Sequence, residues 1–208
     1  KAFKRAGVTE VVMAGKVRKL HLFRNFRPDL TAMKGLMRLK DRRDDSILIT
    51  IAELLHEGGL TLIDQTRYAG QMLAGAGHLA GPPSTKRMPD IEFGFTQAKG
   101  IAALDIGQTI VVQKQAVLAV EAIEGTDEAI TRGVLVGSGE AAVNKVAKPN
   151  QDLRFGVPAG GPDTFETMKA SGCNLLVVEA EKTLMIERQR FFELAASYGI
   201  TVYGHAED

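Results

Sequence analysis

Short, largely apolar runs of four to six residues recur along the chain, and longer segments with helical periodicity separate them. Successive residues of a strand point to opposite faces of the sheet. A run of this length in which successive residues are apolar is therefore typical of a strand buried on both faces. The alternation of such runs with helical segments predicts an α/β fold. The runs that we interpret as strands are Glu10–Ala14, Leu60–Ile63, Thr109–Val112, Ala116–Val120, Ala141–Val146, Asn174–Val178, Thr183–Ile186 and Ile200–Tyr203.

The N-terminal part, up to Ile63, is predicted to alternate between helix and strand. Residues 1–6 have the pattern of a helix end, so the sequence opens inside a helix–strand unit and we expect an earlier βα segment to precede it. Asp44 and Asp45 open an apolar helix, Ile47–His56, where negative charge meets the positive end of the helix dipole. Another helix face is predicted from the spacing of Leu30, Met33, Leu36, Met37 and Leu39.

Glycine and proline residues interrupt the pattern between Gly70 and Pro89, where little periodicity remains. Such a stretch is typical of a loop or of a connection between domains. We therefore predict two small mixed α/β domains with a ligand cleft between them. The predicted parts are an incomplete, Rossmann-like N-terminal domain over residues 1–80, a linker over 81–90 and a C-terminal domain over 91–208.

The C-terminal part is predicted to contain a β-hairpin whose strands flank Gln113–Gln115. This turn lacks the Asn-Gly or Asp-Gly pair that is common in two-residue hairpin turns. Asp163, with Glu166 three residues later, has the spacing of a capping box at the start of a helix. Further helices are predicted over Asp90–Ala103, Thr126–Thr131 and Glu187–Ser197.

The composition excludes several classes of protein. The sequence has 26 Lys and Arg residues against 25 Asp and Glu residues, whereas a dedicated nucleic-acid-binding domain is strongly basic. The single cysteine, Cys173, excludes a disulfide framework and a zinc site made of several cysteines. No apolar run approaches the roughly 18–20 residues that a transmembrane helix needs.

Three carboxylates, Glu121, Glu124 and Asp127, follow the second strand of the predicted hairpin. At a turn from strand to helix, such carboxylates can bind a divalent cation through oxygen ligands. Gly125 and Thr126 lie between them, and the first N–H groups of the following helix can bind a phosphate. The alternative is structural: Thr126 is the N-cap, and the acidic residues favour the first helical turn. Spacing alone leaves both interpretations open.

Lys148, Gln151 and Arg154 form a second polar group, which precedes Gly160 and Gly161. Lysine and arginine side chains can bind a pyrophosphate, and arginine can do so with two parallel hydrogen bonds. The glycine pair would let a ligand approach the backbone closely. The alternative for this segment is a solvated polar loop between two strands.

Three strings in the C-terminal part carry a resemblance to a known family. They are LDIGQTIVVQKQAVLAVEAIEGTDEAITRG, KVAKPNQDLRF and LLVVEAEKTLMIERQ. In these strings the sequence resembles the UDP-2,3-diacylglucosamine pyrophosphatases of lipid A biosynthesis, the type unrelated to the calcineurin-like phosphoesterases. The resemblance extends from about Lys1 to the C-terminus, and its core from Asp105 to Gly161 has no gap. In that family a glycine-rich segment precedes the point where this sequence begins.

The resemblance implies a two-domain cytoplasmic enzyme that uses Mg²⁺ and contacts the cytoplasmic face of the inner membrane peripherally. Such an enzyme hydrolyses UDP-2,3-diacylglucosamine to UMP and 2,3-diacylglucosamine 1-phosphate, with the lipid held between the domains. Its partners are therefore this nucleotide-sugar lipid and the lipid 1-phosphate product, without nucleic acid. The resemblance leaves open whether the protein forms a homo-oligomer.

The resemblance also assigns roles to residues. The family's DIGQ motif is Asp105–Gln108, its EAxEGTD motif is Glu121–Asp127 and its KPxQ motif is Lys148–Gln151. The catalytic candidates are position 156, Asp105 and Asp127. The metal candidates are Glu121, Glu124 and Asp127. The substrate-binding candidates are Lys16, Asp45, Gln108, Gly125, Thr126, Arg132, Lys148, Gln151, Arg154 and Gly161.

One departure from the family affects the reaction itself. After QDLRF the family has Asp-Val-Pro-Thr-x-Gly, and this aspartate is its catalytic carboxylate. Here that position is Gly156, the threonine is replaced by Ala159, and Glu181 stands where the family usually has glycine. We therefore expect this chain to hydrolyse the substrate poorly. The alternative function is a binding protein that holds the nucleotide-sugar lipid without turnover.

Overall fold

A computed structural model describes residues 2–15, 33, 35, 37, 44–83 and 85–207. The contacts divide the chain into two compact units. The first consists of Lys1–Tyr68 with Asp152–Phe155, and the second of Ala69–Gln151 with Gly156–Asp208. The chain therefore passes between the units three times, because a four-residue segment from the C-terminal part belongs to the first unit.

The first unit contains a pair of short parallel strands and a long helix. The predicted helix Ile47–His56 is confirmed, with Asp44 and Asp45 at its start. Around Leu30–Leu39 only residues 33, 35 and 37 are described, and their backbone is helical. The elements are α1 (Ala2–Arg5), β1 (Glu10–Val11), α4 (Asp44–Glu57), β2 (Thr61–Leu62) and α5 (Thr66–Ala69), the last of which ends at the boundary.

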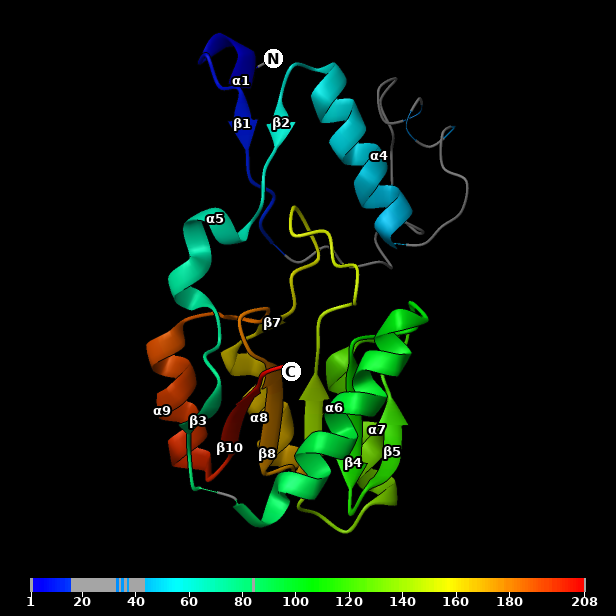
Figure 1. Ribbon diagram of the computed structural model, residues 1–208, viewed down its shortest axis with the longest axis vertical. Helices are drawn as coiled ribbons and strands as arrows, with labels where there is room; N and C mark the ends of the chain where they lie inside the picture. The colour runs from blue at the N-terminus through cyan, green and yellow to red at the C-terminus, as the bar shows by residue number, and fades with distance from the viewer. Residues whose placement is uncertain are drawn as a thin grey trace. The chain divides into compact units, whose positions relative to one another are not determined.

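The second unit is built on a six-stranded sheet with the strand order β3–β10–β8–β6–β4–β5 (Figure 1). The strands β6, β8 and β10 are parallel, whereas β3 and β4 run antiparallel to their neighbours in the middle of the sheet. The strands are β3 (Gly77–Ala80), β4 (Thr109–Gln113), β5 (Ala116–Val120), β6 (Ala142–Lys145), β8 (Leu175–Glu179) and β10 (Thr201–His205). A separate parallel pair consists of β7 (Ala159–Gly160) and β9 (Leu184–Met185).

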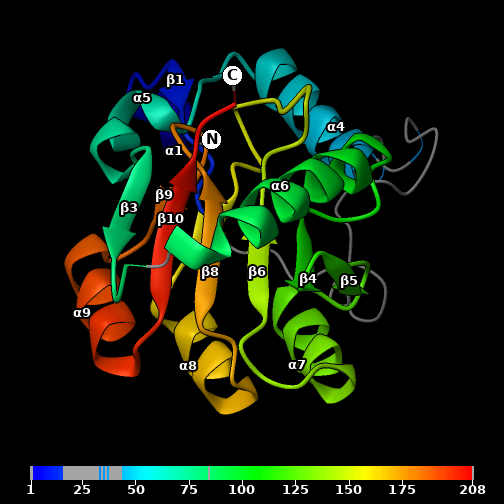
Figure 2. The same ribbon diagram turned by 60° about the horizontal axis from the view of Figure 1, so that its bottom comes forward.

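Helices cover both faces of this sheet (Figure 2). Successive strand residues point to opposite faces, so Val111 packs with the core beside α7, α8 and α9, whereas Ile110 and Val112 pack beside α6. Among the described residues the longest helix has 16 residues, and no helix there has the length and apolar composition of a bilayer-crossing segment. The helices are α6 (Met88–Ala103), α7 (Thr126–Val136), α8 (Pro162–Ser171) and α9 (Arg188–Tyr198).

The stretch from Gly70 to Pro89, predicted to be a loop or a connection between domains, contains regular structure. Residues 77–80 form β3, which pairs with β10 at the outer edge of the sheet. Two short 3₁₀ helices, η1 (Gly70–Met72) and η2 (Thr85–Arg87), flank this strand. Strand β3 belongs to the sheet of the second unit. The boundary between the units therefore lies between residues 68 and 69, before the predicted linker 81–90.

The predicted hairpin is confirmed as β4 and β5, and its turn has an unusual sequence. Lys114 and Gln115 have φ angles of 49° and 58°, the left-handed conformations that glycine and asparagine adopt more easily. Asp90 of α6 supports this turn, because its Oδ1 accepts the N–H of Gln115 at 2.7 Å. Arg87 in turn donates to Oδ2 of Asp90 at 3.2 Å. Contacts from the neighbouring helix therefore stabilise a turn that lacks Asn-Gly.

The predicted N-cap Asp163 is wrong, and Thr126, considered as an alternative N-cap, is not one either. Helix α8 begins at Pro162 after Gly161, so Asp163 lies in the first turn instead of at the N-cap. Helix α7 has Gly125 as its N-cap, with φ 99° and ψ 173°, a conformation that is essentially restricted to glycine. Thr126 is therefore the first helical residue. In both helices a glycine occupies the N-cap position, and no side-chain hydrogen bond caps the helix.

The buried Cys173 provides a test of the core. It is 2% exposed, and burial raises the pKa of its thiol from 9.0 to about 11. At pH 8 this shift alone lowers the reactive thiolate fraction about 100-fold. We expect iodoacetamide to label the folded protein at least this much more slowly than the protein in urea, as measured by mass spectrometry. Rapid labelling of the folded protein would contradict the buried position.

Candidate functional site

The strand order brings several polar segments to one edge of the large sheet. The parallel strands β6, β8 and β10 end at this edge, and the antiparallel β4 begins there. Thr109 at the start of β4 pairs with Lys145 at the end of β6. The N–H of Val146 then donates to the carbonyl of Gln108 at 2.9 Å. Because α/β proteins bind ligands at the carboxyl ends of parallel strands, this edge is the candidate site.

We call Asp105, Gln108, Lys148, Gln151 and Gly156 the Lys148 cluster. Nζ of Lys148 lies 2.5 Å from Oδ1 of Asp105, and the two side chains are only 16% and 27% exposed. Nε2 of Gln108 donates to Oε1 of Gln151 at 3.0 Å. The segments 105–108 and 148–151, which are far apart in the sequence, therefore lie against each other as a polar group with one fixed cation.

Two residues of the Lys148 cluster have left-handed backbone conformations. Asp105 has φ 58°, which is unfavourable for most residues although aspartate tolerates it better than most. Gly156 has φ 71°, and a Cβ added there would lie 2.8 Å from Nε2 of Gln151. Position 156 therefore adjoins the cluster directly, and any side chain placed there would meet the amide of Gln151.

A second group, the Thr126 cluster, consists of Thr109, Glu121, Thr126 and Lys145. Oγ1 of Thr126 donates to Oε1 of Glu121 at 2.9 Å and accepts a hydrogen bond from Nζ of Lys145 at 3.2 Å. Oγ1 of the buried Thr109 lies 3.5 Å from Oγ1 of Thr126. Because Thr126 begins α7, this cluster surrounds the N-terminus of a helix, whose first N–H groups favour anions.

Gly107 joins the two clusters. A Cβ added to Gly107 would overlap the carbonyl oxygen of Glu121, so only glycine allows the backbone of the 105–108 segment to approach this turn. The N–H of Glu121 also donates to the carbonyl of Thr109 at 2.8 Å. The Lys148 and Thr126 clusters therefore form neighbouring parts of one edge of the sheet.

The three predicted metal ligands, Glu121, Glu124 and Asp127, do not form a metal-binding group. Among the residues that the structure describes, no three His, Cys, Asp or Glu side chains are placed to hold a metal ion. Oε1 of Glu124 instead lies 2.5 Å from Nη2 of Arg132, which also donates to the carbonyl of Val120 at 2.8 Å. The described residues therefore do not fit a Mg²⁺ site made of protein side chains alone.

The pKa of Glu124 reflects these local contacts. It is lowered first by the hydrogen bond from its own backbone N–H and then by the bond from Arg132. Arg132 was predicted to bind phosphate. In the structure it links Glu124 to the carbonyl of Val120 and so stabilises the turn after β5.

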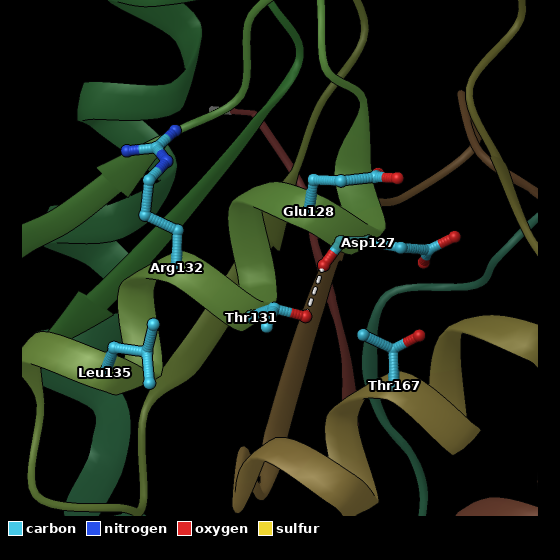
Figure 3. Close-up of a pocket in the computed structure, with 6 residues that line it drawn as sticks. All are labelled: Asp127, Glu128, Thr131, Arg132, Leu135 and Thr167. Carbon is cyan, nitrogen blue, oxygen red and sulfur yellow. Dashed lines mark hydrogen bonds between the residues drawn. The ribbon is translucent and has the colours of Figure 1, made fainter.

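Asp127 and Arg132 line a pocket of about 430 Å³ between α7 and α8 (Figure 3). Within it, Oγ1 of Thr131 donates to the carbonyl of Asp127 at 2.9 Å. These two predicted site residues therefore lie on the helical layer beside the sheet and belong to neither cluster. The other lining residues are Glu128, Leu135 and Thr167.

The remaining predicted residues are distributed over the molecule. Arg154 belongs to the first unit, where its Nη2 lies 2.6 Å from Oδ2 of Asp152 and its hydrogen bonds lower the pKa of that carboxyl group. Asp45 also belongs to the first unit, in the first turn of α4. Gly161 is the N-cap of α8. Lys16 lies outside the described residues.

One residue at the candidate edge was not predicted from the sequence. Glu179, the last residue of β8, is 1% exposed and accepts the N–H of Ala147 with Oε2 at 2.8 Å. A glutamate that ends an otherwise apolar strand was the available signal, because a carboxylate in that position needs buried partners.

Comparison with known proteins covers both parts of the chain. Residues 1–72 match the family model of the LpxI N-terminal domain, and residues 75–203 match that of the LpxI C-terminal domain. The UDP-2,3-diacylglucosamine pyrophosphatase LpxI of Caulobacter vibrioides is 30% identical over 216 aligned residues, which cover 98% of this chain and 77% of that protein. These matches confirm the family resemblance of the three sequence strings.

Proposed function

The chain belongs to the LpxI family, and we propose that it binds UDP-2,3-diacylglucosamine and hydrolyses its pyrophosphate as an enzyme of lipid A biosynthesis. The products would be UMP and 2,3-diacylglucosamine 1-phosphate. The proposal includes a slow reaction in this chain, because Gly156 stands at the family's catalytic aspartate. It also includes a cytoplasmic location with peripheral contact to the inner membrane.

The observation that carries this proposal is the Lys148 cluster at the carboxyl edge of the sheet. A lysine held by Asp105 presents a fixed positive charge, and the amides of Gln108 and Gln151 add polar groups beside it. Ammonium and amide N–H groups are donors to phosphate oxygens, and the N-terminus of α7 adds backbone donors close by. These groups are suited to a diphosphate.

Exposed apolar side chains beside the clusters support a lipid substrate. Leu104 and Ile106, which flank Asp105, are 69% and 47% exposed, and Ile123 in the turn before α7 is 76% exposed. Each CH₂ group of an acyl chain that is buried on such side chains contributes about 0.8 kcal/mol. Apolar surface next to phosphate-binding groups fits a ligand with both a diphosphate and acyl chains.

In the proposed reaction, the residues of this chain would bind and orient the diphosphate. Hydrolysis requires an oriented water and stabilisation of the charge that develops on the phosphoryl oxygens. Lys148 would supply positive charge, and Asp105 would hold the ammonium group in place. Position 156 would orient the water in relatives that have aspartate, whereas Gly156 has no side chain to accept a proton.

Mg²⁺ stays part of the proposal through the family resemblance. Proteins often bind Mg²⁺ through one or two carboxylates together with substrate phosphates and water, so a complete protein cage is not required. The metal requirement is tested by assaying UMP release with Mg²⁺ and with EDTA.

Lys148→Ala is expected to weaken the binding of UDP-2,3-diacylglucosamine by roughly 10- to 150-fold, because a hydrogen bond to a charged group contributes about 1.5–3 kcal/mol. Isothermal titration calorimetry measures the affinity. Lys169→Ala is the matched control, because Lys169 on α8 lies over the ring of Tyr198 on α9 and belongs to neither cluster. Equal affinities for the chain and its Lys148→Ala variant would exclude the Lys148 cluster as the diphosphate site.

A second candidate function is a binding protein without turnover, which Gly156 favours. Mass spectrometry of copurified lipid and an assay of UMP release separate the two candidates. Bound lipid without any UMP release would support the binding protein. If the chain neither binds the lipid nor releases UMP, both candidate functions are wrong.

A further inference from the structure

Glu179 is a buried carboxylate that the proposed reaction does not yet use. Its Oε1 lies 3.0 Å from Nζ of Lys99 on α6 and 2.8 Å from Nζ of Lys182, so two cations balance its charge. The same contact raises the pKa of Lys182, for which Glu179 is the first cause and Glu207 the second. Because Oε1 contacts both lysines, Oε2 is left to accept the N–H of Ala147.

Ala147 is held from two sides. Glu179 accepts its N–H at 2.8 Å, and Nζ of Lys99 donates to its carbonyl at 3.4 Å. The preceding residue, Val146, donates its N–H to the carbonyl of Gln108 at 2.9 Å. The Glu179–Lys99 pair and the carbonyl of Gln108 therefore fix the backbone directly before Lys148.

We propose that Glu179 is a positioning residue that acts through Ala147 on Lys148, an inference that rests on the proposed function of Lys148. The ammonium group of Lys148 meets Asp105 at 2.5 Å, and a shift of about 1 Å in the backbone that carries the side chain would lengthen this contact to the limit of a hydrogen bond. Glu179 thus holds Lys148 where it meets both Asp105 and the diphosphate.

Glu207 provides a matched control. It shares both lysines with Glu179, at 3.4 Å from Nζ of Lys99 and 2.9 Å from Nζ of Lys182, and its side chain is 49% exposed. Glu207→Gln therefore removes a negative charge from the same two lysines, while the bond from Ala147 to Glu179 stays intact. A general electrostatic role of Glu179 and a specific role through Ala147 predict different results for this pair of variants.

The first measurement is hydrogen exchange of backbone amides in the ligand-free protein. In Glu179→Ala we expect the Ala147 amide to exchange at least about 10-fold faster relative to the Val111 amide of β4, which reports the stability of the second unit. Glu207→Gln should leave this ratio unchanged. Glu179→Gln, which keeps an oxygen for the Ala147 N–H, should restore most of the protection. An unchanged ratio in Glu179→Ala would overturn the proposal.

The second measurement is the affinity for UDP-2,3-diacylglucosamine in a double-mutant cycle. Glu179→Ala should weaken binding in the presence of Lys148, but cause no further loss in the Lys148→Ala background. Additive losses would overturn the positioning role.

If the unaltered chain does not bind this lipid, the proposed function fails, and the exchange ratio alone decides whether Glu179 holds the Ala147 backbone. If Glu179→Ala does not fold, Glu179→Met replaces it, because methionine has a similar size but no oxygen for the Ala147 N–H. Binding by Glu179→Met as strong as that by Glu207→Gln would overturn the proposal.

Discussion

Gly156→Asp is expected to increase the rate of UMP release by about 10²- to 10⁴-fold, the usual contribution of a positioned acid or base. The new carboxylate would start from a Cβ 2.8 Å from Nε2 of Gln151, so the flexible end of that side chain must move by a few tenths of an ångström. The left-handed backbone at this position, with φ 71°, is one that aspartate tolerates better than most residues. The measurement compares UMP release in Mg²⁺ by the chain and by this variant.

Gly156→Asn is the matched control for this gain. Asparagine has nearly the size of aspartate and the same tolerance of a left-handed backbone, but it is not a base at neutral pH. We expect the asparagine variant to stay as slow as the glycine chain. Equal and rapid turnover by the chain and by Gly156→Asp would place the required carboxylate elsewhere, with Asp152 and Asp127 as candidates. Slow turnover by both would point to Ala159.

Phe155→Ala is expected to destabilise the first unit by about 3–5 kcal/mol, the usual effect of removing a buried aromatic ring. Phe155 is 2% exposed and packs in one core cluster with Ala52 and Leu62. We expect the amides of α4 to exchange faster in this variant, while those of β4 keep their protection, because β4 belongs to the second unit. Hydrogen exchange with residue resolution measures both.

Leu153→Ala is the control from the same segment. Leu153 is 39% exposed, and its carbonyl accepts the N–H of Gln65 at 2.9 Å, a bond that the substitution leaves in place. We expect a change within about 0.5 kcal/mol. Equal loss of protection in α4 and β4 for Phe155→Ala would contradict a role confined to the first unit.

Apolar runs predicted strands inside the sheet, such as β8, and also the edge strand β5, which has the predicted bounds Ala116–Val120. Strand β8 is buried at all five positions, so its apolar run in the sequence was sufficient to find it. Strand β3 at the opposite edge was missed, because Gly77–Ala80 shows little apolar pattern. The helix start at Gly125 was missed because it depends on a backbone conformation that glycine adopts, which the capping rules for side chains do not describe.

For the site, the sequence predicted the segments but not their contacts. Gln108 and Gln151 are 43 residues apart, and only the antiparallel pairing of β4 with β6 brings them together. Arg132 was predicted to bind phosphate from its residue type, but it contacts Glu124 in its own turn. Residue type and spacing do not reveal whether a local partner already engages a charged side chain.

The three crossings of the chain between its units restrict how proteins of this kind can recombine. The family models meet between residues 72 and 75, close to the first crossing. A chimera joined there would combine one parent's first-unit core with the other parent's Asp152–Phe155 segment, which must fit that core. The two halves are therefore not interchangeable modules, and homologous exchange of the N-terminal half has to include these four residues. A substitution on one side of this join therefore restricts which residues are tolerated on the other side.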